Sequence, residues 1–599
     1  MKRNQHPGGN ILVVTLIMVV VISAFVLSAM SVTGNTARMT DRSRDYAAAQ
    51  AAAEGAVEYA FGIWKTRITA QNRAITTAEA NASLGAPALP GFEYASVAED
   101  GPLKIDGLDE YGAPGATPTA VKVSLASYPG WAGLSYTYRA RAKMQQPAGG
   151  YSFRAGVQRQ FQYSEVPLFQ SMFFFEDDIE FYRPSDMTVS GLVHTNGTAY
   201  MSSSSAGTLT LEDQVSYVTA YTDSSDPPFA DTWSGWVANS TQPPTFPQGQ
   251  SAQLHQVPRM EPLGDEPAAI IDTTDANPNN DGIHEIIEPP NTGYPDPQEF
   301  AERRMYNKAG IRVNIHNGAL TVTGQNGVTL SAAQQTLIAG SLTAKTTIYD
   351  QREGKSVDVT SIDVGSLGDA LTTGGVTGFN NVLYINDTTP AGGATPNPSA
   401  VRLINGGTLP DGGLTVASEN PIYIQGDYNT GTVGTNSSAV PANGLGNADN
   451  TASPVVPGYV SKASAVISDA VMLLSNNWQD ANSSLDLTAR AATNTTYNTA
   501  IVSGFIPSGY QPAVGAQYGY SGGANNFPRF LESWNSQYCT YYGSMVALYQ
   551  SKRFTGAWDT GVIYRPPLRR WNFDSSFRNT PPPGSLDGTT WSRGTWAKY

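Results

Sequence analysis

The fold is decided by residues 1–30, MKRNQHPGGNILVVTLIMVVVISAFVLSAM, which continue into residues 31–65, SVTGNTARMTDRSRDYAAAQAAAEGAVEYAFGIWK. No charged residue occurs from Ile11 to Val32, where Ile, Leu, Val, Met and Phe dominate. About 22 such residues span roughly 33 Å as a helix, enough to cross the hydrocarbon core of a membrane. Helical sequence without proline follows to about Thr77. We therefore predict one helix of about 60 residues, apolar all round in its first half and amphipathic in its second.

The flank before the apolar run is basic, because Lys2, Arg3 and His6 precede Pro7-Gly8-Gly9 and no acid lies among them. Basic residues beside a membrane helix tend to stay on the cytoplasmic side. The sequence therefore predicts a single-pass inner-membrane protein whose C-terminal region is periplasmic.

Three short motifs carry a resemblance to a known family: GNILVVTL at residues 9–16, LSAM at 27–30 and AAQAAAE at 48–54. Together they resemble the N-terminus of PilX-type minor pilins, over roughly the first 65 residues. The resemblance implies cleavage by prepilin peptidase between Gly9 and Asn10, with N-methylation of the new terminus. It also implies a fold in which a long helix packs on a small antiparallel sheet, and other pilin subunits as partners.

One departure from the major pilins concerns the fifth residue after the cut, which is Val14 here and glutamate there. A carboxylate in lipid is energetically costly unless it is paired. A subunit that lacks this glutamate cannot pair with the terminal amine of a neighbouring subunit. This favours a rare subunit or the filament tip. We expect the helix to pack on other subunits, helped by small residues at four positions: Ser23, Ala24, Ser28 and Ala29.

Composition limits the remaining possibilities. The 599 residues include 59 Gly and 39 Pro but only 14% charged residues, which suits β-rich extracellular proteins. A net charge of −14 argues against nucleic-acid binding. The single cysteine, Cys539, excludes an intramolecular disulfide, and we expect it buried in a strand.

Alternating segments predict strands at residues 120–128, 134–144 and 151–163, and hence an antiparallel meander. We place a leader at 1–9 and a pilin-like module at 10–165, with the membrane helix at 11–32. A β-rich extracellular region follows at 166–565, with a large insertion at 222–297. The Pro- and Trp-rich tail at 566–599 is expected to lack regular structure.

The β-rich region repeats short apolar strands that end at Gly or Asn, as in MTVSGLVHTNGTAYM and NPIYIQGDYNTGTV. Such phrases are typical of the coils of a β-solenoid, but their spacing is irregular, so a β-sandwich stays open. The fold class is therefore α+β, mainly β. Two short helices are predicted at 296–308, capped by Asp296, and at 527–534.

A possible metal site is the stretch 277–288, NPNNDGIHEIIE, which has the oxygen-ligand spacing of a calcium loop. Its departures from the motif favour a solvated loop, with a calcium ion that stabilises the loop as the alternative. No other cofactor is indicated. The calcium ligands would be Asp275, Asn277, Asn279, Asp281, Ile283 and Glu288.

Acidic residues gather at Glu176-Asp177-Asp178-Ile179-Glu180, which we interpret as a solvated strand face. No nucleophile elbow, phosphate loop or paired metal-binding histidine motif occurs, so the sequence predicts no enzyme. It indicates a non-catalytic pilin-like or pseudopilin-like subunit at or near a filament tip, which acts in priming or adhesion. A surface or a polysaccharide is the expected ligand. The alternative is a membrane-anchored envelope protein that binds or cleaves polysaccharide, with Asp178 and Glu180 as its carboxylate pair.

Overall fold

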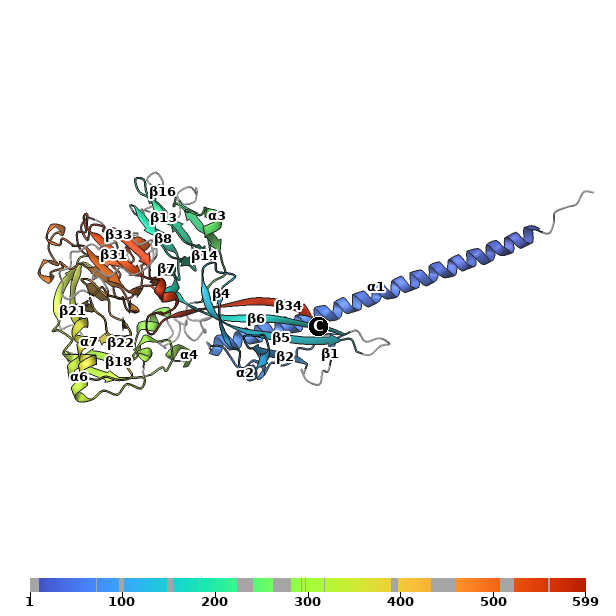
Figure 1. Ribbon diagram of the computed structural model, residues 1–599, viewed down its shortest axis with the longest axis horizontal. Coiled ribbons are helices and arrows are strands. Elements are labelled where there is room, and N and C mark those ends of the chain that lie inside the picture. Colours follow the sequence, from blue (N-terminus) through green and yellow to red (C-terminus); the bar gives the residue numbers. More distant parts are fainter. Residues whose placement is uncertain are drawn as a thin grey trace, which may run out of the picture. The chain divides into compact units, whose positions relative to one another are not determined.

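The computed structural model describes residues 10–71, 73–95, 102–147, 154–181, 184, 186–223, 241–261, 282–291, 293–296, 298–316, 318–388, 397–431, 459–506, 522–558 and 561–599 (Figure 1). Strands hold about 37% and helices about 24% of the chain, which confirms a mixed fold that is mainly β. Two compact units are present. The first unit consists of Met1–Val121, Ser135–Tyr163 and Trp591–Tyr599, and the second unit of Lys122–Leu134 and Ser164–Thr590.

The first unit is built on the helix α1, Asn10–Gln71, whose 62 residues confirm the predicted length. Every residue from 11 to 44 is exposed, whereas burial begins at Ala49. The buried positions then recur three or four residues apart and form one stripe. That stripe consists of Ala49, Ala53, Ala56, Val57, Ala60, Trp64 and Ile68.

The helix ends six residues earlier than predicted because a separate helix, α2 (Thr77–Asn81), begins after it. The Thr76 hydroxyl accepts a hydrogen bond from the Glu79 amide at 3.1 Å, and the Glu79 carboxylate accepts one from the Thr76 amide at 2.7 Å. This reciprocal capping box satisfies two amides that a continuous helix would have used otherwise.

An antiparallel sheet covers the buried stripe of α1, as the meander prediction requires. Its main strands follow the order β3-β2-β5-β6-β34, and β1 and β4 also pair with β5. The Trp64 ring is fully buried, with ring centroids 5.1 Å from Tyr138 and 5.6 Å from Phe161. The strands are β1 Glu93–Tyr94, β2 Leu103–Leu108, β3 Pro114–Gly115, β4 Ala120–Ser124, β5 Ala132–Gln145, β6 Arg154–Pro167 and β34 Asp587–Lys598.

The C-terminal tail was expected to be irregular, and this prediction is wrong. Strand β34 takes its place beside β6, so the end of the chain completes the sheet of the first unit. The centroid of the Trp591 ring lies 6.4 Å from that of the Tyr163 ring. The Lys65 ammonium lies 4.7 Å from the same Trp591 centroid. Local composition could not show this, because the pairing partner lies more than 400 residues earlier in the chain.

The second unit is a stack of parallel strands. Its longest sheet is parallel throughout except for the terminal pair of β18 and β19. In spatial order its strands are β17 Leu254–Gln256, β14 Val215–Tyr217, β10 Val193–Thr195, β7 Phe173–Phe175, β32 Met545–Ala547, β29 Ala500–Ser503, β26 Ser464–Ser468, β24 Leu414–Ser418, β22 Val382–Asp387, β18 Ile311–His316 and β19 Ala319–Gly324.

This order shows that the chain enters the stack in its middle, at β7. It first winds outward through β10 and β14 to β17, then crosses to the opposite end at β18. From there it winds back until β32 pairs with the free edge of β7. The first and last coils of the second unit are therefore neighbours.

Further sheets form the other faces of the coils. Except for two antiparallel pairs, β20 with β21 and β12 with β16, their strands pair in parallel. This agrees with the solenoid-like fold that the strand phrases favour, and not with a sandwich, which packs two antiparallel sheets. One has the order β20 Thr346–Asp350, β21 Lys355–Asp363, β23 Ser399–Ile404, β25 Ile422–Gln425, β27 Val471–Leu474 and β30 Arg529–Phe530. The smaller ones are β28 Thr495–Asn498, β31 Tyr538–Gly543 and β33 Leu568–Phe573; β8 Ile179–Phe181, β11 Ala199–Met201 and β15 Tyr221–Asp223; β9 Met187–Val189 and β13 Leu209–Leu211; and β12 Ser203–Ser204 and β16 Thr241–Gln242.

In the turns between the coils, asparagine and glycine residues adopt the left-handed backbone conformation. Asn405 and Asn429 have φ angles of 52° and 58°. At Gly413, with φ 88°, a Cβ atom would lie 1.8 Å from the Ala463 carbonyl oxygen, so only glycine is accommodated between these coils. Cys539 is fully buried on β31, as predicted.

Two predicted helices differ from those observed. Residues 296–308 form two short helices, α4 (Gln298–Ala301) and α5 (Met305–Lys308). The Asp296 carboxylate, predicted to cap a helix, accepts two hydrogen bonds from the buried Arg304 guanidinium, at 2.7 and 2.8 Å. Residues 527–534 contain the strand β30, which pairs in parallel with β27. The other helices of the second unit are α3 Gln250–Gln253, α6 Ala332–Ala339 and α7 Val364–Thr373.

The place of β34 leads to a first prediction. Replacing Trp591 by alanine removes the ring that packs on Tyr163 and Lys65. We expect amide exchange in β6 and in the second half of α1 to accelerate by about tenfold to a hundredfold, or ~1.4–2.8 kcal/mol. Trp596→Ala is the matched control, because this ring on the same strand is 39% exposed. Equal exchange rates in the two variants would contradict the assignment.

Candidate functional site

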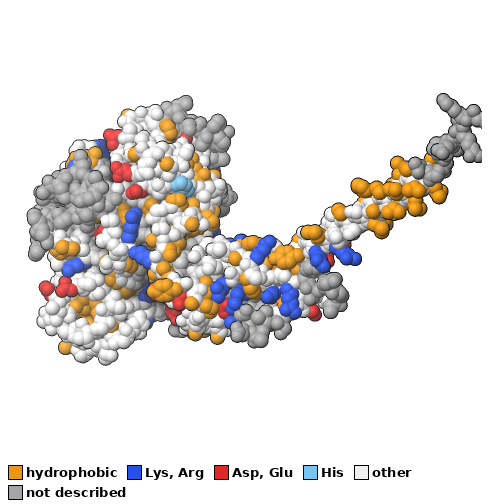
Figure 2. Space-filling model, turned by 45° about the vertical axis from the view of Figure 1, so that its right-hand side comes forward, with side chains coloured by type: hydrophobic (Ala, Val, Ile, Leu, Met, Phe, Trp, Pro, Cys, Tyr) orange, Lys and Arg blue, Asp and Glu red, His pale blue; other side chains and the backbone are white. Residues whose placement is uncertain are grey.

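The exposed part of α1 is the first candidate site. Among the described residues, α1 is the one helix that is long and apolar enough to cross a membrane. Its most apolar stretch of 18 residues has a mean hydropathy of 3.0. Apolar side chains cover this part of the helix, and none of that window is buried (Figure 2). The hydroxyl of Thr15 donates to the Ile11 carbonyl oxygen at 2.6 Å, so this polar group is satisfied within the helix.

The four small residues expected at subunit contacts are all exposed on this segment. At 100° per residue, Ala24 and Ser28 share one face of the helix, while Ser23 and Ala29 each lie roughly 120° away from the centre of that face. The structure thus brings two of the four onto one surface. Asn10 begins α1, and Gly9 lies outside the described residues.

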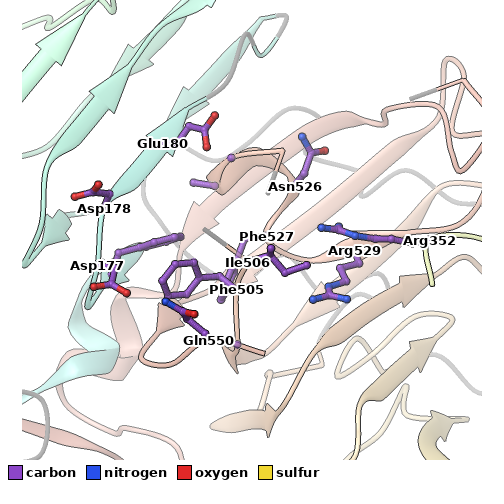
Figure 3. Close-up of a pocket in the computed structure, with 14 residues that line it drawn as sticks. Asp177, Asp178, Glu180, Arg352, Phe505, Ile506, Asn526, Phe527, Arg529 and Gln550 are labelled. Carbon is purple, nitrogen blue, oxygen red and sulfur yellow. The ribbon is translucent and has the colours of Figure 1, made fainter. Parts of the chain in front are cut away.

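A pocket of about 210 Å³ in the second unit is the other candidate site (Figure 3). Carboxylates lie on one side and the guanidinium groups of Arg352 and Arg529 on the opposite side, with Phe505 and Phe527 between them. The carboxylates belong to Asp177, Asp178 and Glu180. Sequence reasoning missed the arginine and aromatic walls, because they come from coils far from the acidic run in sequence.

The acidic run itself is only partly the solvated face that was predicted. Asp177 and Asp178 are exposed, but Glu176 and Glu180 are 8% and 4% exposed. The chain turns a corner at residues 176–178, between β7 and β8, so strand alternation does not apply there. Glu176 is paired with Arg259 and accepts a hydrogen bond from Asn196 at 2.8 Å.

Loss of hydration shifts the pKa values of charged groups on both sides of the pocket. Asp177 is exposed but loses part of its hydration shell at the pocket, which raises its pKa, and repulsion from the adjacent Asp178 acts in the same direction. On the opposite side, burial together with the nearby Arg529 lowers the pKa of Arg352 to about 9. Arg529 is held by Glu353, with 3.0 Å between the guanidinium nitrogen and the carboxylate oxygen.

The proposed calcium loop falls largely outside the described residues, which exclude Asp275, Asn277, Asn279 and Asp281. The other two ligands are described: Ile283 begins a short 3-10 helix, and the Glu288 carboxylate accepts a hydrogen bond from the Lys552 ammonium at 2.9 Å. Within the described ranges, no group of three or more His, Cys, Asp or Glu side chains is placed to hold a metal ion. The calcium site stays a prediction.

His284, in the same 3-10 helix, forms a buried network that the sequence did not reveal. One ring nitrogen contacts Glu288 and the other lies 3.0 Å from the Asp469 carboxylate. Ionised carboxylates can only accept hydrogen bonds, so this arrangement favours the imidazolium form of the ring, in which both nitrogens donate. Burial alone would lower the pKa of His284, but these two hydrogen bonds outweigh it and raise the pKa. No local motif marks the pair, because its members are 185 residues apart.

The raised pKa leads to a second prediction. The pair with Asp469 is fully formed below the pKa of an unfolded histidine and is lost as the pH rises through the folded-state pKa. We therefore expect the wild-type chain to lose stability, relative to the non-titrating His284→Gln, when the pH is raised from about 6, below the ordinary pKa of histidine, to an alkaline value. His284→Ala should cost about 2–4 kcal/mol of unfolding free energy, because Asp469 is fully buried.

Urea denaturation at both pH values would measure these differences. His316→Gln is the control, because this histidine lies exposed at the end of β18. A wild-type stability that changes with pH no more than that of His284→Gln would show that the imidazolium pair is not formed.

No known protein family matches the chain, and no curated protein matches it. Among solved structures, a match is the competence-associated pilin ComZ from Thermus thermophilus, at 9% sequence identity and a TM-score of 0.27. The match covers 92% of this chain and 97% of that chain.

Proposed function

We propose that this chain is a non-catalytic, pilin-like subunit of a type IV filament system. One observation carries the proposal: the single helix α1 is apolar and exposed over its first half and packs on an antiparallel sheet over its second half. An exposed apolar surface of this length needs either lipid or other helices around it. A filament subunit meets both environments, the inner membrane before assembly and the helical filament core afterwards.

The residues before α1 support the same proposal. Lys2, Arg3 and His6 keep the leader in the cytoplasm, so the two units lie in the periplasm before assembly. Gly9 and Asn10 flank the cleavage site of prepilin peptidase. The partners are then this peptidase, the inner membrane and other pilin subunits.

A position at or near the filament tip follows from two features. Val14 stands where a glutamate would pair with a neighbour's terminal amine, so this contact is not available along a shaft. The second unit also holds most of the chain, and a unit of this size is difficult to repeat in a closely packed shaft. From the tip the second unit can prime assembly or adhere to a surface or polysaccharide.

A membrane-anchored protein that binds or cleaves polysaccharide is the second candidate. Asp178 and Glu180, the pair that this function requires, line one pocket. Glu180 is only 4% exposed, and the rings of Phe505 and Phe527 in the same pocket are also nearly covered, so little open surface is available to a sugar.

Processing of the leader gives a third prediction. Co-expression with prepilin peptidase should yield a chain that begins at Asn10, and Gly9→Val should remain uncut, because the peptidase must fit the residue before the scissile bond. Gly8→Val is the matched control and should be cut normally. Intact mass and N-terminal sequencing measure the outcome. A wild-type chain that keeps Met1 in the presence of an active peptidase would contradict the proposal.

Helix packing gives a fourth prediction. Substituting both Ala24 and Ser28 by isoleucine should lower incorporation into filaments roughly fivefold to tenfold, or ~1 kcal/mol, because the larger side chains prevent close helix contact. Membrane insertion should be unchanged. Val19→Ile with Val26→Ile, on the opposite face of α1, is the control. Immunoblots of sheared filaments and membranes measure both quantities, and equal incorporation of the two double variants would exclude this contact face.

A further inference from the structure

The pocket of the second unit has an uncompensated negative charge on its carboxylate side. Asp177 and Asp178 are adjacent and exposed, and neither forms an ion pair in the part of the chain that the structure describes. The arginine side differs, because Glu353 compensates Arg529. The carboxylate side of the cavity therefore attracts a cation from outside the chain.

These carboxylates are held in place before any ligand arrives, because each accepts a hydrogen bond, and the donor to Asp177 is the Gln550 side chain. The Thr198 amide donates to Asp178 at 2.6 Å, which fixes one of them. At Gly197 a Cβ atom would lie 2.5 Å from that same carboxylate oxygen, so glycine allows the close approach. A preorganised pair loses little entropy when it binds a ligand.

The floor of the pocket is apolar. The Phe175 ring lies 6.1 Å from that of Phe505 and 5.3 Å from that of Phe527, and Ile506 extends the surface. An aliphatic stem packs on such a floor while its charged end stays with the carboxylates, and a cation near ring edges and faces gains further.

We propose that this pocket binds an ammonium group on a short aliphatic stem, the chemistry shared by a lysine side chain and a free aliphatic amine. The ammonium lies beside the Asp177 carboxylate, Asp178 adds negative charge on the same side, and the stem lies over Phe505 (Figure 3). This assignment goes beyond the proposed filament function and does not depend on the helix α1.

Two other ligand classes suit the pocket less well. Sugar rings stack on open aromatic faces, but the rings of Phe175, Phe505 and Phe527 are only 4%, 8% and 6% exposed. An anion that approached the arginine side would meet Asp177 and Asp178 in the same small cavity.

Calorimetric titration of the full-length protein in detergent micelles tests the proposal. The probes are Nα-acetyl-lysine amide, 1,5-diaminopentane and the uncharged isostere Nα-acetyl-norleucine amide. We expect at least one amine to bind at least tenfold more tightly than the norleucine compound. Preference for the lysine compound would identify a polypeptide lysine as the ligand, and preference for the diamine a free amine.

Variants connect the binding to the carboxylates. The change Asp177→Asn with Asp178→Asn should weaken amine binding at least tenfold, while Asp369→Asn, an exposed residue of α7 away from the pocket, should not alter it. The single variant Asp177→Asn keeps the hydrogen bond from the Thr198 amide to Asp178. If the double variant unfolds, the affinity of this single variant for the amines is measured instead. The proposal is overturned if neither amine binds, if norleucine binds equally, if the Asp369 and pocket variants behave alike, or if a neutral oligosaccharide displaces the amine.

Discussion

The second unit depends on the double pairing of β7. This short strand, Phe173–Phe175, is hydrogen-bonded to β10 on one edge and to β32 on the other. The chain winds outward from β7 in one direction and returns from the other end, so the last coil must close on the first. The unit therefore cannot complete its longest sheet until residue 547 has been placed, and contacts of such long sequence separation fold slowly.

Buried charges hold the connecting segments on the coils of this unit. Arg304 is fully buried and is paired with Asp296 and Glu285, and His284 is paired with Asp469. Such pairs contribute little net stability, but removal of one partner leaves a buried charge uncompensated. They hold the segment that precedes β18 against the coils. Only 14% of the residues are charged, and several of these lie inside. Asp177 and Asp178 at the pocket differ, because they accept hydrogen bonds but form no ion pair within the described ranges.

The first unit is stabilised mainly by burial of apolar side chains between α1 and the sheet. The second half of α1 is stable because Trp64 and the small residues of its stripe are buried against the sheet. Its first half has no such cover, and its exposed Ile, Leu, Val and Phe side chains require lipid or partner helices. Incorporation of β34 into the sheet means that the unit needs both ends of the chain. Most of the second unit, Ser164–Thr590, comes between β6 and the end of β34 in the sequence. Local composition therefore predicts a boundary near residue 165 and a separate tail.

The sequence by itself determined the features that neighbouring residues encode: the apolar span Ile11–Val32, the continuous helix, the alternating strands of the meander and the buried Cys539. These follow from side-chain periodicity and composition over ten to twenty residues. Only the tertiary structure decided the pairing of β7 with β32, the place of β34, the break in residues 296–308 and the bond between His284 and Asp469. It also brought Asp177 and Asp178 to a pocket with Arg352 and Phe505. These pairings join segments separated by hundreds of residues, and they are selected by packing and charge complementarity in the folded chain, which no local pattern records.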